Sequence, residues 1–378
     1  MLRLRWRRVA VPFRNAIASA QATYRMRESV LIELEAADGL RGTGEAALPA
    51  GASFEAHGSS IEAFLEDASC HLTGRGPGHG LRGLALPADE PGSWSAAVVC
   101  GLETALADLA AREAGIPMYR WLASHADLPG DGSEIDVNGL VDLTEPGAAA
   151  RNAARLAARG FRTLKLKVGG EPRAALGTVA AVRDAVGPKV TLRCDANRSW
   201  EYGDALRFLE GCHVHGVALC EEPIADPGHD YSALAALRDS SPVPLAVDES
   251  TRTAGALERA IAAGAADAVV IKPMASGLAE ALAMIARARA ADLPVIVTTT
   301  FDLAPGTGVA LHLAALAGAP ALACGLATLE RVENPLGSGV PPVIDGRMRL
   351  PEQPGLGVTL DAAAVERYAV GNWSEVEP

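Results

Sequence analysis

The spacing of the hydrophobic positions changes once along the chain. Apolar and polar residues alternate over 2–12, 28–35 and 43–47, which predicts three strands. Apolar residues recur at helical spacing over 54–72 and 93–114, which predicts two helices. Because these strands come before the helices, the first ~130 residues are typical of an α+β unit.

From residue 135 onward, short apolar runs rich in β-branched residues alternate with helical stretches. Strands are predicted over 135–141, 163–168, 190–195, 215–221, 245–248, 268–272, 294–299 and 321–326. Helices are predicted over 145–159, 172–186, 202–211, 231–240, 254–263, 277–290 and 307–317. Strict alternation calls for parallel strands, and eight of them favour an α/β fold closed into a TIM-type (β/α) barrel.

An open doubly wound sheet is the alternative architecture for such a pattern. It would require a glycine-rich phosphate loop after the first strand, where this chain has Asn138-Gly139-Leu140. We therefore predict an α+β capping domain over 1–133 and a barrel over 134–341, with 342–378 folding back to complete the capping domain.

Composition narrows the class of partner. The net charge is −12 without a basic block, so we expect no nucleic acid as partner. No apolar run in the sequence reaches the ~20 residues that span a bilayer, so we expect no membrane partner. The six cysteines have no C-x-x-C spacing, which predicts reduced thiols and a cytoplasmic protein. Whether the chain forms a homo-oligomer stays open.

Charged residues follow five consecutive barrel strands at a nearly constant interval. They are Lys167 (with Lys165 two residues before it), Asp195, Glu221, Asp248 and Lys272, with intervals of 28, 26, 27 and 24 residues. A strand, a helix and two loops take roughly 30 residues. Since parallel barrel strands end at one rim, where the catalytic groups of this fold lie, we predict an active site there.

Three of these side chains suit a metal ion. Asp195, Glu221 and Asp248 supply only oxygen ligands, which Mg²⁺ prefers, and without a cation they would repel one another. Helix capping by each residue is the alternative. Glu222 and Glu249 point to the opposite face from their neighbours, so with Asn197 they are predicted to support the ligands from behind.

The lysines suit proton transfer. Lys165 and Lys167 lie on the same face of one strand, so mutual crowding and burial are expected to lower their pKa values toward neutrality. Lys272 faces the same cavity from across the ring; surface lysines are the alternative. A cation that holds a substrate carboxylate stabilises the enediolate formed when a base removes the α-proton. We therefore expect a small carboxylate-bearing substrate, with racemisation or β-elimination as the reaction.

At these residues the chain resembles the enolase superfamily, specifically its muconate-lactonizing subgroup. The matching motifs are Lys165-Leu166-Lys167, Asp195-Ala196-Asn197, Glu221-Glu222-Pro223, Asp248-Glu249-Ser250 and Lys272-Pro273. The resemblance implies a modified, enolase-like barrel, a capping domain whose loops close over it, and Mg²⁺, for which Mn²⁺ can substitute.

Within the subgroup the chain is most similar to o-succinylbenzoate synthases of menaquinone biosynthesis. The likeness rests on the segments 137–140, 192–200, 298–308 and 324–328. It implies that Lys167 removes the proton and then protonates the leaving hydroxyl in a syn dehydration, with Lys272 against the other face of the ring. The expected substrate contacts are Arg193, Thr299, Thr300 and Asp302. These synthases commonly carry serines where Thr298–Thr300 stand, a departure that affects the succinyl contacts.

Other reactions of the superfamily remain as alternatives. Dipeptide epimerases carry Asp-x-Asp on the last strand to hold a substrate ammonium, and here Arg331 takes the first of those positions, with Glu330 and Glu333 beside it. Asp302 is another candidate partner for an ammonium. N-succinylamino acid racemases and muconate cycloisomerases share both lysines. A non-catalytic binding barrel would be expected to have lost lysines or carboxylates, yet all are present.

Overall fold

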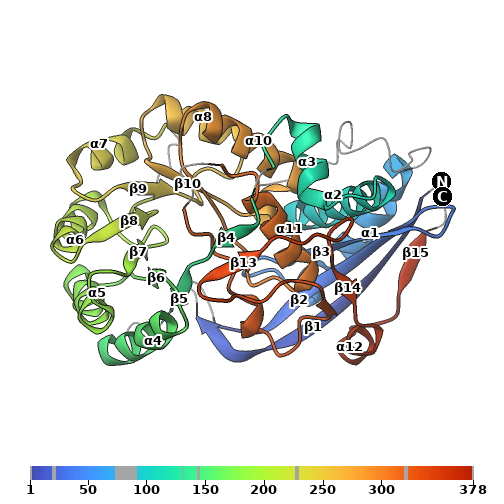
Figure 1. The fold of residues 1–378 in the computed structure, drawn as a ribbon, viewed down its shortest axis with the longest axis horizontal. Coiled ribbons are helices and arrows are strands. Elements are labelled where there is room, and N and C mark those ends of the chain that lie inside the picture. The colour runs from blue at the N-terminus through green and yellow to red at the C-terminus, as the bar shows by residue number, and fades with distance from the viewer. Residues whose placement is uncertain are drawn as a thin grey trace.

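A computed structural model describes residues 2–18, 23–72, 92–130, 132–142, 145–225, 230–318 and 322–376 of the chain (Figure 1). The strands and helices fall into an antiparallel sheet covered by helices and a ring of alternating parallel strands and helices. The α/β barrel with a separate N-terminal capping domain, predicted from the hydrophobic pattern, is confirmed.

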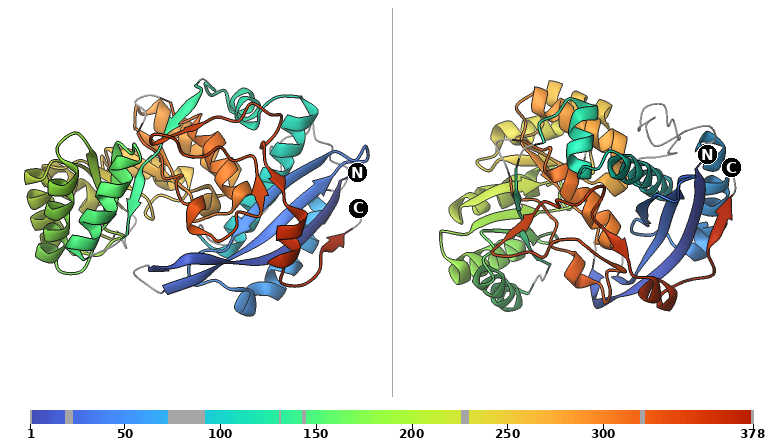
Figure 2. Two further views of the ribbon diagram at one scale, coloured as in Figure 1. Left: turned by 60° about the horizontal axis from the view of Figure 1, so that its bottom comes forward. Right: turned by 45° about the vertical axis from the view of Figure 1, so that its right-hand side comes forward.

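The N-terminal sheet consists of β1 (Arg3–Ala18), β2 (Thr23–Glu35), β3 (Arg41–Ala47) and β15 (Ser374–Val376), in the order β15-β1-β2-β3. The first two strands are longer than predicted, because their pairing continues beyond Pro12 after a shift in register. The C-terminal strand β15 pairs antiparallel with β1, so the two ends of the chain lie side by side (Figure 2).

Helices α1 (Phe54–Leu72) and α2 (Trp94–Glu113) cover this sheet. Among the described residues, α2 is the one helix long and apolar enough to cross a membrane, but 94% of that window is buried inside the protein. Its contact with β3 depends on glycine: a Cβ on Gly44 would overlap the carbonyl oxygen of Gly101 in α2. The helix therefore belongs to the core of the fold.

The barrel strands follow one another around the ring in chain order. They are β5 (Gly139–Val141), β6 (Thr163–Lys167), β7 (Thr191–Asp195), β8 (Val217–Glu221), β9 (Leu245–Val247), β10 (Ala268–Ile271) and β11 (Val295–Val297). The surrounding helices are α4 (Pro146–Ala158), α5 (Pro172–Val186), α6 (Tyr202–Val214), α7 (Ser232–Ser240), α8 (Ala254–Ala262), α10 (Leu278–Ala290) and α11 (Ala304–Ala314). The register pairs Lys167 with Asp195 and Asp195 with Glu221, which aligns the strand ends.

The ring closes through the segment predicted as the eighth strand. Its first residue, Ala321, lies outside the described residues. Beyond it, Cys324 bridges to Val137 and Gly325 bridges to Thr298, so this short stretch joins both edges of the sheet. The pairing is too brief to form a regular strand within the described residues, but it completes the barrel.

The predicted strand 135–141 is divided in two. Its first part, β4 (Glu134–Asp136), pairs antiparallel with β13 (Arg347–Arg349), and only Gly139–Val141 joins the barrel as β5. Helix α3 (Met118–Ala126) was not predicted; it begins directly after Pro117, and a proline is favourable where a helix begins.

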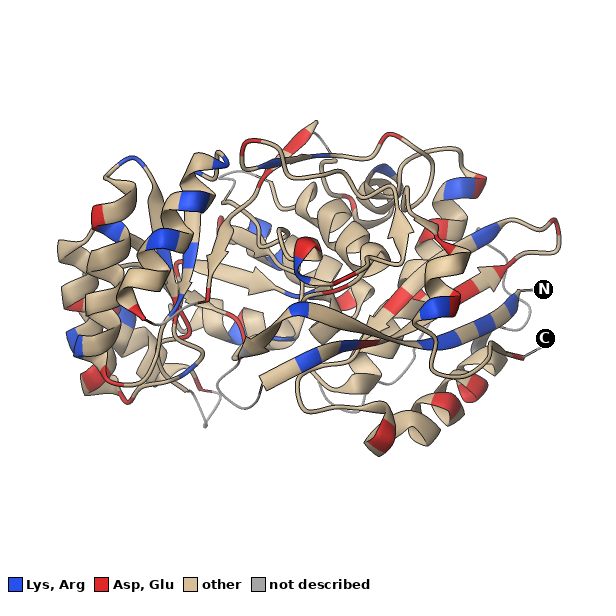
Figure 3. Cartoon of the chain, turned by 90° about the horizontal axis from the view of Figure 1, so that it is seen from below, with Lys and Arg blue, Asp and Glu red and all other residues tan. Residues whose placement is uncertain are grey.

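Several short elements complete the chain. They are α9 (Pro273–Ser276), the 3₁₀ turn η2 (Leu329–Arg331), α12 (Ala362–Arg367), and the paired strands β12 (Gly337–Ser338) and β14 (Thr359–Leu360). Lys and Arg are interspersed with Asp and Glu over the molecule (Figure 3). On β1, for example, Arg3 pairs with Glu375.

Candidate active site

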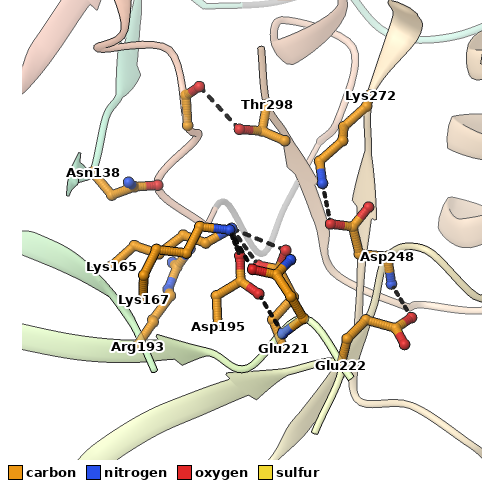
Figure 4. A network of polar contacts seen from close by, with 12 residues as sticks. Asn138, Lys165, Lys167, Arg193, Asp195, Glu221, Glu222, Asp248, Lys272 and Thr298 are labelled. Carbon is orange, nitrogen blue, oxygen red and sulfur yellow. Dashed lines mark hydrogen bonds and ion pairs between the residues drawn. The ribbon is translucent and has the colours of Figure 1, made fainter. Parts of the chain in front are cut away.

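The five rim positions predicted from the sequence meet at one end of the barrel. Lys167, Asp195 and Glu221 are the last residues of β6, β7 and β8, while Asp248 and Lys272 directly follow β9 and β10. Their side chains point toward one another in Figure 4. Because the strands run parallel in chain order, an interval of one βα unit places each side chain next to the previous one.

Lysine amines bridge the three carboxylates. Lys165 donates to Glu221 at 2.9 and 2.7 Å and lies 2.8 Å from Oδ2 of Asp195. The Nζ of Lys167 donates to the same Oδ2 at 2.6 Å. On the other side of the group, Lys272 forms an ion pair with Asp248. The carboxylates are almost fully buried, with exposed fractions of 0%, 4% and 2% for Asp195, Glu221 and Asp248.

The carboxylates respond differently to this environment. Burial alone would raise the pKa of Asp195, but the ammonium groups of Lys165 and Lys167 hold it well below its ordinary value. For Glu221, burial and the charge of Asp195 raise the pKa well above the ordinary value. Asp195 is therefore held in its carboxylate form, whereas burial and the charge of Asp195 disfavour the ionised form of Glu221.

The predicted lowering of the pKa is wrong for Lys165, and the pKa of Lys272 is raised as well. Burial would lower both, but Asp195 and Glu221 raise the pKa of Lys165, and Asp248 raises the pKa of Lys272. The sequence argument considered only the repulsion between neighbouring lysines. In the fold, a carboxylate lies closer to each amine than another amine does. In this structure both side chains are therefore ammonium groups.

The donor set fits a hard cation. Within the described ranges, no three His, Cys, Asp or Glu side chains are already arranged around a common point as metal ligands are; lysine amines bridge the carboxylates instead. Three buried carboxylates on neighbouring strands nevertheless offer only oxygen donors, and a bound cation would neutralise the like charges that, together with burial, raise the pKa of Glu221. Asp195, Glu221 and Asp248 are the residues that would hold Mg²⁺.

The residues predicted to support the ligands lie directly behind them. Glu222 is fully buried and accepts from the backbone N–H groups of Asp248 and Ser250 at 2.7 and 2.9 Å, which positions the end of β9. Burial and the charge of Glu249 raise the pKa of Glu222 to about 7. Asn197 accepts from Lys167 at 2.7 Å and donates to Glu249 at 2.8 Å.

Two of the expected substrate contacts have structural partners instead. Arg193 is buried and donates to the carbonyl oxygen of Ala323 at 2.9 Å, thereby holding the segment that closes the barrel. Burial lowers the pKa of its guanidinium. The hydroxyl of Thr299 contacts that of Thr328 at 2.6 Å. The resemblance to the synthases suggested both residues as substrate contacts, and in this structure their polar atoms have partners within the barrel.

Asp302 and Thr300 belong to a buried cluster between the capping domain and the barrel. Asp302 accepts from the backbone and hydroxyl of Thr300 at 3.1 and 2.5 Å. Arg27 of β2 donates to the carbonyl oxygen of Thr300, and Glu45 of β3 accepts from Leu303 at 3.0 Å. Because burial and the charge of Asp302 raise the pKa of Glu45 to about 7, this cluster links the two domains electrostatically.

Sequence reasoning did not single out Arg27 and Glu45, whose side chains connect the capping domain to the barrel. The available signal was a charged residue inside an otherwise apolar strand or helix, as in Gly44-Glu45-Ala46. Arg331 stands at the position where dipeptide epimerases carry the first aspartate that holds the substrate ammonium. Its guanidinium forms an ion pair with Asp142 at 2.9 Å. Its neighbour Glu330 points outward to Arg159.

Comparison with known proteins identifies the family to which this chain belongs. Residues 148–364 match the family model described as enolase C-terminal domain-like, and residues 1–122 match the N-terminal domain of mandelate racemase / muconate lactonizing enzyme. The chain therefore belongs to the enolase superfamily, and it is an enzyme of that superfamily.

Individual relatives carry several activities. A D-Ala-D/L-Ala epimerase of Cytophaga hutchinsonii is 32% identical over 56% of this chain, which spans about half (55%) of that relative. An aromatic dipeptide epimerase of Herpetosiphon aurantiacus is 31% identical over 76% of this chain and 79% of its own length. An o-succinylbenzoate synthase of Thermobifida fusca is 34% identical over 63% of this chain and 77% of its own length.

A solved structure agrees over the full length. The Cytophaga hutchinsonii dipeptide epimerase, complexed with Mg and the dipeptide D-Ala-L-Val, has a TM-score of 0.85 at 24% identity and covers 99% of both chains. This likeness supports the fold. It leaves the reaction of this chain to be argued from its own residues.

Proposed function

We propose that this chain catalyses Mg²⁺-dependent removal and return of the proton α to a substrate carboxylate, and that the reaction is epimerisation of a dipeptide. The observation that carries the proposal is the convergence of Lys167 and Lys272 on one group of three buried carboxylates (Figure 4). Epimerisation needs one proton-transfer group on each face of the reacting carbon.

The strand order provides the two faces. Lys167 ends β6 and Lys272 follows β10, and three strands, β7 to β9, lie between them in the ring. In a barrel that closes through a short eighth segment, this spacing places the two amines across the mouth from each other. The carboxylates of Asp195, Glu221 and Asp248 end the three intervening strands, so a substrate carboxylate directed at them would have a lysine on either side.

The roles follow from this arrangement. When bound, Mg²⁺ supplies the positive charge that stabilises a carboxylate substrate as its α-proton leaves. The proposed reaction requires one lysine to lose the proton that it carries as an ammonium group and then, as a neutral amine, to take the α-proton from one face. The other lysine, as an ammonium group, donates a proton to the opposite face. Exchanging these roles performs the reverse reaction, so both Lys167 and Lys272 are required for epimerisation.

The choice of a dipeptide substrate is supported by the relatives. Epimerases acting on dipeptides recur among the similar sequences, from Cytophaga hutchinsonii, Herpetosiphon aurantiacus and Bacillus subtilis. The syn dehydration that forms o-succinylbenzoate was our first expectation from sequence. This dehydration becomes the second candidate, because fewer of these relatives are o-succinylbenzoate synthases than dipeptide epimerases.

One observation keeps the synthase as the second candidate. Arg331, 2.9 Å from Asp142, places a cation where the epimerase pattern has an acidic residue. A cation disfavours the ammonium group of a dipeptide and suits a second substrate carboxylate.

The test is exchange of the α-proton in D₂O. A panel of L,L-dipeptides is incubated with the Mg²⁺-loaded enzyme, and deuterium at the α-carbon is followed by NMR. We expect exchange with inversion for the wild type. Lys167→Ala and Lys272→Ala should each abolish inversion, whereas Lys189→Ala, an exposed lysine between α5 and β7, should change nothing.

The second candidate is tested on the same enzyme preparation with the cyclohexadiene precursor of o-succinylbenzoate, followed by absorbance. Dehydration of that compound together with no exchange in any dipeptide would replace our proposal with the synthase. Activity on neither substrate class would exclude both named reactions.

A further inference from the structure

We propose that Asn197 is a positioning residue that holds the amine of Lys167 for proton transfer, and that Glu249 sets the orientation of the Asn197 amide. The inference rests on the proposed function, in which Lys167 serves one face of the substrate. It concerns how the two lysines are held by different partners.

Lys167 has two hydrogen-bond acceptors. One is Oδ2 of Asp195 at 2.6 Å, which also lies 2.8 Å from the amine of Lys165. The other is Oδ1 of Asn197 at 2.7 Å. The carboxylate oxygen is shared between two lysines and belongs to a residue proposed to hold Mg²⁺. The amide oxygen is therefore the acceptor available to Lys167 alone.

The amide of Asn197 has one chemically acceptable orientation. Its Nδ2 donates to Oε1 of Glu249 at 2.8 Å, while its Oδ1 faces the ammonium group. A flipped amide would place an N–H donor against the ammonium and an oxygen against the carboxylate. The charge of Glu249 thus determines which end of the amide Lys167 meets.

The backbone also favours this arrangement. Asn197 has a φ of 44°, in the left-handed region that Asn and Gly tolerate better than other residues. Its N–H donates to Oδ1 of Asp195 at 3.1 Å, which ties the turn to the end of β7. The side chain therefore starts from a fixed backbone position next to the amine.

Lys272 is held differently. Its hydrogen-bond partner in the described part of the chain is Asp248, with no amide group between them. The charge of Glu249 also acts on Lys272, so changes to Glu249 reach both lysines. Changes to Asn197 should reach Lys167 alone.

The experiment measures exchange separately for the two epimers of a dipeptide substrate. Lys167→Ala and Lys272→Ala first identify which epimer each lysine deprotonates. Asn197→Gly then removes the amide without straining the backbone, since glycine tolerates positive φ. We expect exchange from the Lys167 epimer to fall about 10- to 100-fold in kcat, as for the loss of a hydrogen bond to a charged group. Exchange from the Lys272 epimer and KM should change less than about 3-fold.

A matched variant tests the part assigned to Glu249. Asn197→Asp keeps an oxygen for Lys167 but places a carboxylate against Glu249, so its exchange rate should also fall. Asn197→Asp combined with Glu249→Gln restores a hydrogen bond between the two side chains, now donated by the amide at position 249, and leaves an oxygen for Lys167. It should recover most of the Lys167 exchange relative to Asn197→Asp alone.

Crystal structures give a readout independent of turnover. Lys167 should occupy one position in the wild type and several in Asn197→Gly, with Lys272 unchanged. Equal losses for both epimers, no loss for either, or an unaltered Lys167 would overturn the inference. Absence of exchange in the wild type with every substrate would instead overturn the proposed function, and the crystal structures would still decide the positioning role.

Discussion

The carboxylate of Glu103 in α2 accepts a hydrogen bond from the backbone N–H of Leu278, the first residue of barrel helix α10, at 2.7 Å. The same oxygen accepts from Ala279 at 3.0 Å. A side chain from the N-terminal part of the chain thus satisfies the open N–H groups of a barrel helix. Burial raises the pKa of Glu103 to about 7, so this connection between the domains titrates near neutrality.

Replacing Glu103 with Gln should make folding stability less dependent on pH. Folding raises the pKa of Glu103 from 4.5 to about 7, so the folded protein binds this proton more tightly than the unfolded chain does. The resulting stabilisation of the fold is fully present below the unfolded pKa of 4.5 and is lost as the pH rises through the folded pKa of about 7. Each pKa unit corresponds to about 1.4 kcal/mol. The wild type should therefore lose about 3 kcal/mol relative to the Glu103→Gln variant between about pH 5 and about pH 8, measured by urea unfolding.

The matched control is Glu113→Gln, an exposed residue at the end of the same helix. It should follow the wild type at both pH values. If Glu103→Gln also parallels the wild type, the buried carboxylate is not the group that titrates.

His312 should contribute the opposite pH dependence. Its ring accepts from the N–H of Tyr119 at 3.0 Å and lies 3.1 Å from the carbonyl oxygen of Leu356, and burial lowers its pKa from 6.5 to about 4. Below the ordinary value the unfolded chain binds a proton that the folded chain does not. Stability is therefore lost as the pH falls from 6.5 towards about 4, by up to about 3 kcal/mol.

The test is His312→Asn, which keeps an acceptor for Tyr119 and cannot titrate. Its stability should fall less than that of the wild type over this acidic range in chemical unfolding. A decline as steep as that of the wild type would assign the acid sensitivity to other groups.

Substituting Gly44 should damage the contact between β3 and α2. A Cβ at this position overlaps a backbone oxygen of Gly101, which cannot move aside as a flexible side chain can. We expect Gly44→Ala to cost more than about 2 kcal/mol, as for overpacking in a core. Thermal unfolding would measure the effect. The control is Gly177→Ala in α5, where the added Cβ meets nothing within 4 Å and should stabilise the helix by roughly 0.5–1 kcal/mol.

Addition of Mg²⁺ should raise the unfolding temperature, and chelation should lower it again. A ligand at 100 times its Kd stabilises the folded state by about 2.7 kcal/mol. Asp195→Asn should remove this response, because it replaces one of the three proposed oxygen ligands with a neutral group. The control is Asp239→Asn, whose side chain is 79% exposed on α7. An equal response to Mg²⁺ in Asp195→Asn would place the cation elsewhere.

The rim of the site could be predicted from sequence because its spacing is a property of the fold. A βα unit of constant length repeats the same position at each strand end, so Lys167, Asp195, Glu221 and Lys272 could be assigned to one opening without coordinates. The face of each residue followed from alternation along a strand. Both arguments depend on local geometry, which the sequence encodes directly.

The partners of the side chains could not be predicted in the same way. Thr300 and Asp302 lie near the rim in sequence, yet they contact one another and Thr300 accepts from Arg27, because the capping domain packs against that loop. The prediction for the lysine pKa values failed for the same reason, since the pKa depends on which charge lies closest in space.

The sequence by itself determined the class of fold, the order of the strands and the set of residues that share the barrel mouth. These follow from hydrophobic period and repeat length, which act over a few residues at a time. Only the tertiary structure decided that lysines bridge the carboxylates, that Asn197 links Lys167 to Glu249, and that Glu103 and Glu45 join the domains. Hydrogen bonds and charges act over a few ångströms in space, and residues so distant along the chain are brought within that range only when the whole domain packs.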